Sequence, residues 1–272
     1  MNRREFLASS AAAGAGALVL SGCATGSTDP LVGTAGARAS GAPSVYEMRV
    51  YHFNDGKGEA LLNRFRHHTL RLFKKHGIES VGYWLPVDAK DQRLHFLLRY
   101  PSREAREASW KAFVADPEWQ AAYKASEANG ALVKKAETPF LVRTDYSPVH
   151  TSGNVSKGGV FELRTYTTPP GRLANLDARF RDHTLALFAR HGMHNWLYFH
   201  KMPDQPEADV ALVYFLTHAS QDAARASFAK FGADPEWKKA REESEKNAGG
   251  SLTVAGGVKS VFLRPTEFSP TR

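Results

Sequence analysis

The segment RFRHHTLRLFKKHGI at residues 64–78 occurs again as RFRDHTLALFARHGM at residues 179–193, 115 positions later. An upstream segment, YEMRVY at residues 46–51, has its counterpart in FELRTY at residues 161–166, and the offset is again 115. Self-similarity at one fixed offset is typical of a repeated structural unit. We therefore predict that the folded part of the chain is one domain written twice.

Two further matches locate the differences between the copies. DPEW occurs at residues 116–119 and 234–237, an offset of 118, and DYSP at residues 145–148 matches EFSP at residues 267–270, an offset of 122. The offset grows between the matching blocks and not inside them. The sequence therefore predicts that the second copy carries its extra residues in loops.

Within the first copy, the hydrophobic period changes from two to 3.6 and back in a fixed order. The expected elements are a strand at 46–53, a helix at 58–76, strands at 78–85 and 94–100, a helix from 102, a short helix from 117 and a strand at 138–145. Gly77 would end the first helix, and Asp116 would cap the short one. The order βαββαβ is the ferredoxin-like arrangement. We expect an α+β fold in which two such domains close their sheets into one barrel-like unit.

Alternation on the first strand separates an apolar face from a polar face. We expect the apolar face to pack on the helices and the polar face to line the barrel interior. The polar residues of the two copies are Glu47, Arg49, Tyr51, Glu162, Arg164 and Tyr166. A buried Glu–Arg pair requires its own partner or a ligand. Both a structural pair and a ligand-binding site are consistent with this pattern.

Histidines and tryptophans supply further candidates for ligand contact. His68 and His183 occupy matching positions beside the apolar stripe of the first helix, and Trp84 and Trp196 lie on the second strand of each copy. Core packing is the ordinary role of such residues, and ligand contact is the alternative. His67 has Asp182 as its counterpart, so we expect no shared metal site. The sequence contains no motif that identifies a cofactor or a catalytic residue.

The N-terminus resembles a bacterial export and lipidation signal. Arg3 and Arg4 begin a twin-arginine-like motif, and Cys23, which is the only cysteine, follows Leu20 to Gly22 as in a lipobox. We expect a signal peptide at 1–23, a flexible linker at 24–44, and domains at 45–148 and 149–272. Acylated Cys23 would anchor the protein in the lipid bilayer of the cell envelope, facing the periplasm or the exterior.

The formal net charge is +8 and the pI about 9.5. The excess is spread evenly, with 17 Lys and Arg against 13 Asp and Glu at 45–148, and 16 against 13 at 149–272. No basic tail or RNA-binding motif accompanies it, so we expect no nucleic-acid partner. Attraction to anionic lipid headgroups is an open alternative.

The repeated strand, helix and DPEW motifs resemble the NIPSNAP family, over residues 45–148 and 159–270. This resemblance implies a dimeric α+β barrel and no settled reaction. Its superfamily includes haem-binding enzymes and cofactor-free monooxygenases. We expect a membrane-tethered protein that binds a small molecule in the barrel interior. The alternatives are a non-catalytic protein or lipid interaction module, and a haem-dependent or cofactor-free oxygenase-like enzyme; the cofactor and any homo-oligomer stay undetermined.

Overall fold

The computed structural model describes residues 44–272. The predicted export signal, with Arg3, Arg4 and Cys23, and the predicted linker up to residue 43 lie outside the described residues. Over the described range, no helix combines the length and the apolar character that crossing a membrane requires.

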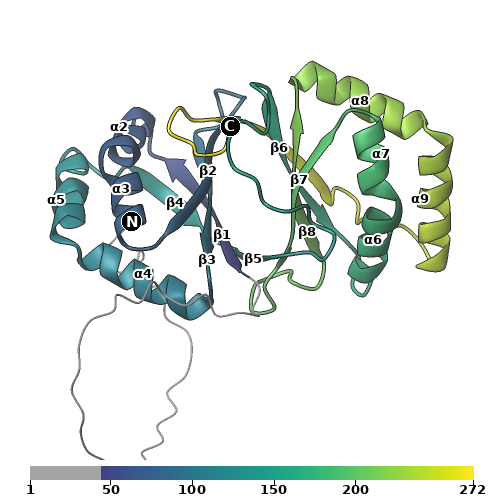
Figure 1. Ribbon diagram of the computed structural model, residues 1–272, viewed down its shortest axis with the longest axis horizontal. Helices are drawn as coiled ribbons and strands as arrows, with labels where there is room; N and C mark the ends of the chain where they lie inside the picture. Colours follow the sequence, from purple (N-terminus) through teal and green to yellow (C-terminus); the bar gives the residue numbers. More distant parts are fainter. Residues whose placement is uncertain (1–43) are drawn as a thin grey trace, which may run out of the picture.

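The two repeats follow the same order of elements (Figure 1). The first contains β1 (Val45–Phe53), α2 (Gly58–Arg64), η1 (Phe65–Thr69), α3 (Leu70–Lys75), β2 (Glu79–Pro86), β3 (Arg93–Tyr100), α4 (Arg103–Ala115), α5 (Pro117–Ser126), β4 (Val133–Glu137) and β5 (Phe140–Arg143). The second contains β6 (Val160–Thr167), α6 (Leu173–Arg179), η2 (Phe180–Thr184), α7 (Leu185–Arg190), β7 (His194–Lys201), β8 (Ala211–His218), α8 (Gln221–Ala233), α9 (Pro235–Asn247) and β9 (Val258–Pro265). The expected strand at 138–145 is only partly correct, because the chain forms two short strands on either side of Thr138 and Pro139.

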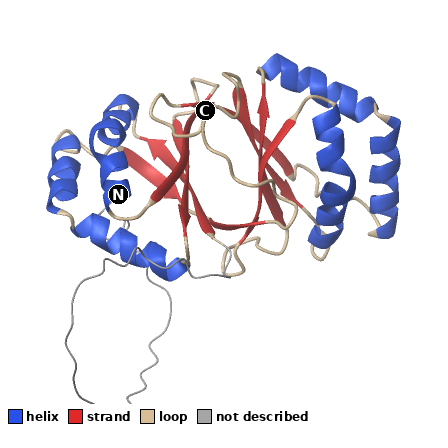
Figure 2. Ribbon diagram, viewed as in Figure 1, coloured by secondary structure: helices blue, strands red, loops and turns tan. Residues whose placement is uncertain are grey.

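The strands form one closed antiparallel barrel. Their order is β3-β2-β9-β6-β8-β7-β5-β1, and β1 pairs with β3 to close the ring, while β4 adds to the far half of β1. The repeats join at two seams, where β2 pairs with β9 and β5 pairs with β7. The helices of the two repeats cover opposite sides of the barrel (Figure 2). Closure leaves no open sheet edge at either seam.

Aromatic side chains fill the middle of the barrel. The rings of Trp84, Trp196, Phe161 and Phe215 contact one another there, and each of these side chains is at most 1% exposed. Two separate hydrophobic cores lie between the barrel and the helices, one in each repeat. The molecule thus has three stacked cores, and the central one is shared by both repeats.

The face assignment made for β1 is wrong. Tyr46, Met48 and Val50 point into the barrel core, whereas Tyr51 and Phe53 belong to the core beneath the helices. The polar residues therefore lie under the helix layer and not in the barrel interior. Both faces of this strand are buried. The alternation separates the two faces, but because both are buried it does not tell which of them packs on the helices.

Each first helix contains one π-helical turn, η1 and η2 at matching positions. At the end of the turn, the backbone amide of Leu70 donates to the carbonyl of Phe65, five residues back, and the amide of Leu185 donates to that of Phe180. The Thr69 hydroxyl donates to the carbonyl of Arg64 at 3.2 Å, and the Thr184 hydroxyl donates to that of Arg179 at 3.0 Å. Such single π-helical turns inside α-helices occur frequently at functional sites. Each of them begins directly after a buried arginine.

Candidate functional site

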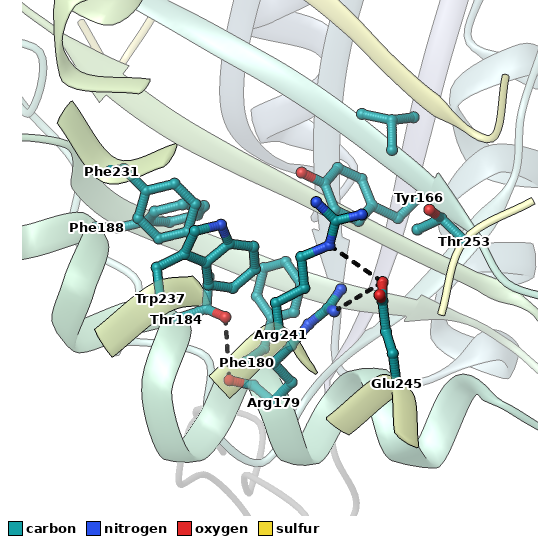
Figure 3. A pocket seen from close by; sticks show the side chains of 11 residues that line it. Tyr166, Arg179, Phe180, Thr184, Phe188, Phe231, Trp237, Arg241, Glu245 and Thr253 are labelled. Atoms are coloured by element: carbon teal, nitrogen blue, oxygen red, sulfur yellow. Dashed lines mark hydrogen bonds and ion pairs between the residues drawn. The ribbon is translucent and has the colours of Figure 1, made fainter. Parts of the chain in front are cut away.

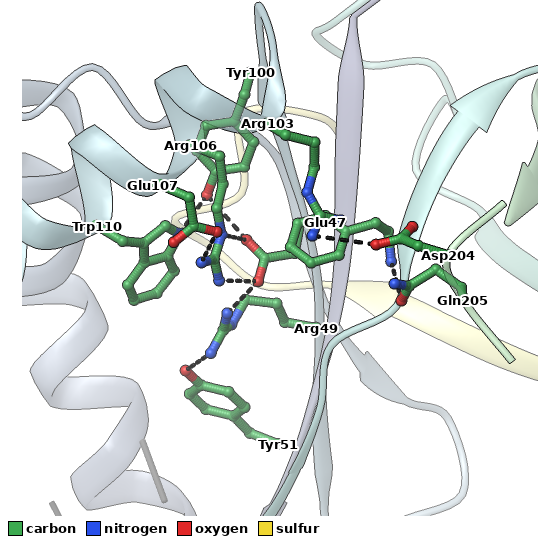
Figure 4. A network of polar contacts seen from close by, with 11 residues as sticks. Glu47, Arg49, Tyr51, Tyr100, Arg103, Arg106, Glu107, Trp110, Asp204 and Gln205 are labelled. Carbon is green, nitrogen blue, oxygen red and sulfur yellow. Dashed lines mark hydrogen bonds and ion pairs between the residues drawn. The ribbon is translucent and has the colours of Figure 1, made fainter. Parts of the chain in front are cut away.

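The polar residues of β1 form a buried network with α4 (Figure 4). Arg49 pairs with Glu47 and donates from Nη2 to the Tyr51 hydroxyl at 3.0 Å. Arg106 of α4 donates to both carboxylate oxygens of Glu47, at 2.8 and 3.2 Å, and Tyr100 donates to Oε2 at 3.2 Å. The carboxylate of Glu47 therefore has several donors and no exposed surface.

Electrostatics keep this carboxylate ionised. Burial alone would raise the pKa of Glu47, but Arg49 and Arg106 outweigh burial and hold the pKa below its ordinary value. Glu107 accepts from Arg106 at 3.0 Å, so two arginines face two carboxylates. The charges balance within the network, which is typical of a structural ion cluster.

The second repeat contains a related network with different partners. Arg164 pairs with Glu162 and donates to the hydroxyls of Tyr166 at 3.1 Å and Tyr214 at 2.9 Å. His218 replaces Tyr100 beside the carboxylate, at 2.9 Å. Ala224 occupies the helix position of Arg106. Here Tyr166 extends the network to the edge of a cavity.

The ten predicted ligand-binding residues therefore do not form one site. Six of them make the two networks, and Trp84 and Trp196 pack inside the barrel. His68 is half-buried beside an open groove between α2 and α5, while His183 is exposed on η2. Among residues 44–272, no group of three or more His, Cys, Asp or Glu side chains is placed to hold a metal ion.

A cavity of about 240 Å³ lies between the barrel and the helices of the second repeat (Figure 3). Its walls come from β6, β9, the first helix with its π turn, α8, α9 and the loop after α9. The lining residues are Tyr166, Arg179, Phe180, Thr184, Phe188, Phe231, Trp237, Arg241, Glu245, Thr253 and Val258. Apolar walls with a few converging polar groups are typical of small-molecule sites.

The charge of this cavity is not balanced. Arg179 is 5% exposed, and its Nη1 lies 3.7 Å from the Glu245 carboxylate, too far for a hydrogen bond. Nε and Nη1 of Arg179 both lack hydrogen-bond partners. Nε of Arg241 contacts the same Glu245 carboxylate, at 3.3 Å from its Oε1. Burial lowers the pKa of Arg179, which nonetheless stays protonated at neutral pH. Two cations thus share one anion.

In the first repeat, side chains occupy the space that corresponds to this cavity. Tyr123 holds the position on α5 that Arg241 holds on α9, at the same offset of 118 as DPEW. The Arg64 guanidinium lies 5.0 Å from the centroid of the Tyr123 ring and 5.4 Å from that of Trp119. In addition, Val133 begins β4 within the hydrophobic core of the first repeat, in place of a polar loop. The cavity is therefore a feature of the second repeat.

Sequence reasoning named Tyr166 and missed the other polar residues of the cavity. Arg179 is the first residue of the repeated RFR segment, and it falls on the buried side of a helix where an apolar residue is expected. A charged residue at a position where an apolar one is expected could have marked Arg179 as a candidate binding residue. Arg241 and Glu245 lie on a highly charged helix, where nothing distinguishes them from solvent-exposed neighbours.

The fold has similar solved structures. A proposed monooxygenase from Fusobacterium nucleatum aligns with a TM-score of 0.52 and 11% identity, covering 85% of this chain and 95% of its own. A second proposed monooxygenase, from Lactobacillus acidophilus, gives a TM-score of 0.51, 10% identity, and coverage of 85% and 97%. At such identities the likeness shows the dimeric α+β barrel-like fold alone.

A NIPSNAP domain protein from Burkholderia xenovorans is 24% identical, with a TM-score of 0.34, and covers 38% of this chain and 98% of its own. A comparison with curated protein sequences finds no match. The sequence model of the NIPSNAP family matches residues 46–148 and 161–270, together more than half of the chain. The chain therefore belongs to the NIPSNAP family.

Proposed function

We propose that this protein binds a small molecule in the cavity of the second repeat. The observation that carries the proposal is the cavity itself, about 240 Å³ in volume, walled by aromatic rings and holding a buried arginine with free donors. Apart from Thr253 in the loop after α9, its walls are formed by helices and strands, which position side chains more precisely than loops do. We place the site beneath the helices and not inside the barrel, where Trp84 and Trp196 leave a packed core.

We further propose that the binding domain is tethered to a membrane of the cell envelope. Arg3 and Arg4 support export, and Cys23 supports acylation. The binding unit would then work at the membrane surface and collect or hold its ligand there. We also propose that each repeat is a ferredoxin-like unit, which the order of strands and helices supports.

Mass spectrometry of the protein extracted natively from the producing cell tests both parts. We expect a co-purified small molecule under native conditions and a diacylglycerol mass on Cys23 after denaturation. The variant Arg241→Tyr reproduces the residue that fills the first repeat and should lose the small molecule. Lys239→Tyr is the matched control, because it adds the same side chain at an exposed position of α9.

Retention of the small molecule by a folded Arg241→Tyr protein, or its loss in Lys239→Tyr as well, would place binding elsewhere and overturn the assignment of the cavity. An unmodified Cys23 would overturn the tether and leave the binding proposal standing.

The oxygenase-like alternative has less support. The residues that line the cavity include no His, Cys or Met to ligate a haem iron, and Arg164 already holds the hydroxyl of Tyr166. The likeness to proposed monooxygenases extends to the fold alone. A non-catalytic interaction module would require a surface of its own. Val149, Val254 and Val258 are exposed, but isolated apolar side chains of this kind are ordinary on soluble proteins.

A further inference from the structure

We infer that the cavity of the second repeat selects a small carboxylate that carries an aromatic ring. This inference rests on the proposed function and adds the chemical class of the ligand. Three observations support it: the state of Arg179, the balance of charge around it, and the nature of the walls.

Comparison of the two repeats isolates what is unusual about Arg179. Its counterpart Arg64 donates from Nη1 to the Ser126 hydroxyl at 3.0 Å and to the Glu127 carboxylate at 3.1 Å. Arg179 occupies the same place before the same π turn, yet its Nη1 has no hydrogen bond. A buried donor left without a partner costs about 1 to 3 kcal/mol, and more when the group is charged. Nε lacks a partner in both arginines, so the two repeats differ at Nη1, which is paired in Arg64 and unpaired in Arg179.

The charges around the cavity define the sign of the ligand. Arg179 and Arg241 face the single carboxylate of Glu245, which lies closer to Arg241. Arg241 is 59% exposed, so solvent screens its charge, and the cation that lacks a hydrogen-bonded anion inside the cavity is Arg179. Arginine presents its donors as a planar fork that matches the two oxygens of a carboxylate. A monocarboxylate therefore supplies both the charge and the acceptors that Arg179 lacks.

The remaining walls define the body of the ligand. Phe180, Phe188, Phe231 and Trp237 line the space beside the charged groups, and the Arg179 guanidinium lies 5.2 Å from the centroid of the Trp237 ring (Figure 3). A dry cavity of about 150 Å³ is known to accept benzene, so about 240 Å³ accommodates one ring with a short polar substituent. Aromatic walls favour a flat ring through edge and offset contacts. Thr253 adds a hydroxyl at the rim.

Isothermal titration of the full folded chain with benzoate and benzamide tests the inference, because the two probes share a shape and differ in charge. We expect benzoate to bind at least about tenfold more tightly, the usual value of a hydrogen bond to a charged group. Arg179→Gln should reduce benzoate affinity by at least tenfold and leave benzamide affinity within a factor of about three. Arg64→Gln, the matched change in the first repeat, should alter neither affinity.

Arg179→Lys guards against misfolding of the glutamine variant, since it keeps the charge and loses the fork. It should bind benzoate with intermediate affinity. Hexanoate tests the ring, and it should bind more weakly than benzoate. Equal affinity for benzoate and benzamide, or tighter binding of hexanoate, would overturn the ligand class and leave small-molecule binding intact. Failure of every probe, together with no co-purified molecule, would overturn both.

Discussion

The rings of Trp84 and Trp196 meet edge to face at the centre of the barrel, with 5.9 Å between their centroids and an interplanar angle of 70°. One residue comes from each repeat. Their contact therefore belongs to the shared core that closes the two half-barrels on each other, together with Phe161, which touches both rings. Edge-to-face pairs of this kind add stability beyond the area they bury.

Trp84→Ala should lower the free energy of unfolding by about 3 to 5 kcal/mol, because it empties a fully buried position in a core that both repeats share. Trp84→Phe is the matched control, since Phe199 stands at the corresponding position of the second repeat. The phenylalanine variant should lose less than half as much. Urea denaturation followed by circular dichroism measures both. Equal losses would mean that the indole contributes nothing specific to the barrel core.

The repeat, the order of the elements and the family could be predicted from sequence, because they depend on local patterns that recur at a fixed offset. The orientation of β1 could not. Glu47 and Arg49 were predicted to line the barrel interior because a polar strand face is not expected to pack on helices. The network with Arg106 supplies charges from α4 instead. A strand buried on both faces gives no hydrophobic signal for its orientation.

The cavity could not be predicted for a different reason. It results from the exchange of Tyr123 for Arg241, and of apolar core residues for a loop containing Thr253, between two copies that otherwise agree. Such small changes in volume leave the periodicity untouched. Only the three-dimensional packing shows that no other side chain fills the space that Tyr123 and its neighbours occupy in the first repeat.

Glu47→Ala should destabilise the fold by about 3 to 5 kcal/mol, because Arg49 and Arg106 would remain buried without their carboxylate. Arg106→Ala should cost less, since Glu47 keeps Arg49 and Tyr100, and the second repeat already has Ala224 at this position. The ratio of the two losses, measured by urea denaturation, checks the interpretation. A larger loss for Arg106→Ala would show that packing of the arginine outweighs charge balance.

His95 should make stability depend on pH in mildly acidic solution. Its side chain is 2% exposed in the barrel interior, and neither ring nitrogen has a hydrogen-bond partner. Burial, reinforced by Arg93, lowers the pKa of His95 from 6.5 to about 4. Between these two values the unfolded chain binds a proton that the folded chain does not. The free energy of unfolding therefore falls as pH decreases through this window, by up to about 3 kcal/mol.

The variant His95→Val removes this titration and supplies the residue that the second repeat has at the same register, Val213. Its stability curve should be flatter than that of the wild type between pH 6.5 and 4, while both proteins still lose stability below pH 4 as carboxylates such as Glu47 are protonated. Denaturation midpoints at half-unit pH intervals measure the difference. Parallel curves would show that His95 titrates normally in the folded protein.

Tyr123→Ala should open a cavity in the first repeat beside Arg64, at a cost of about 2 kcal/mol or more for the lost ring. This new cavity should accept benzoate and benzamide with similar affinity, because Arg64 is already paired with Glu127 and Ser126. Titration in an Arg241→Tyr background isolates it from the natural site. A strong preference for benzoate there would show that any buried arginine selects a carboxylate, and that the missing hydrogen bonds of Arg179 are not what determines the ligand.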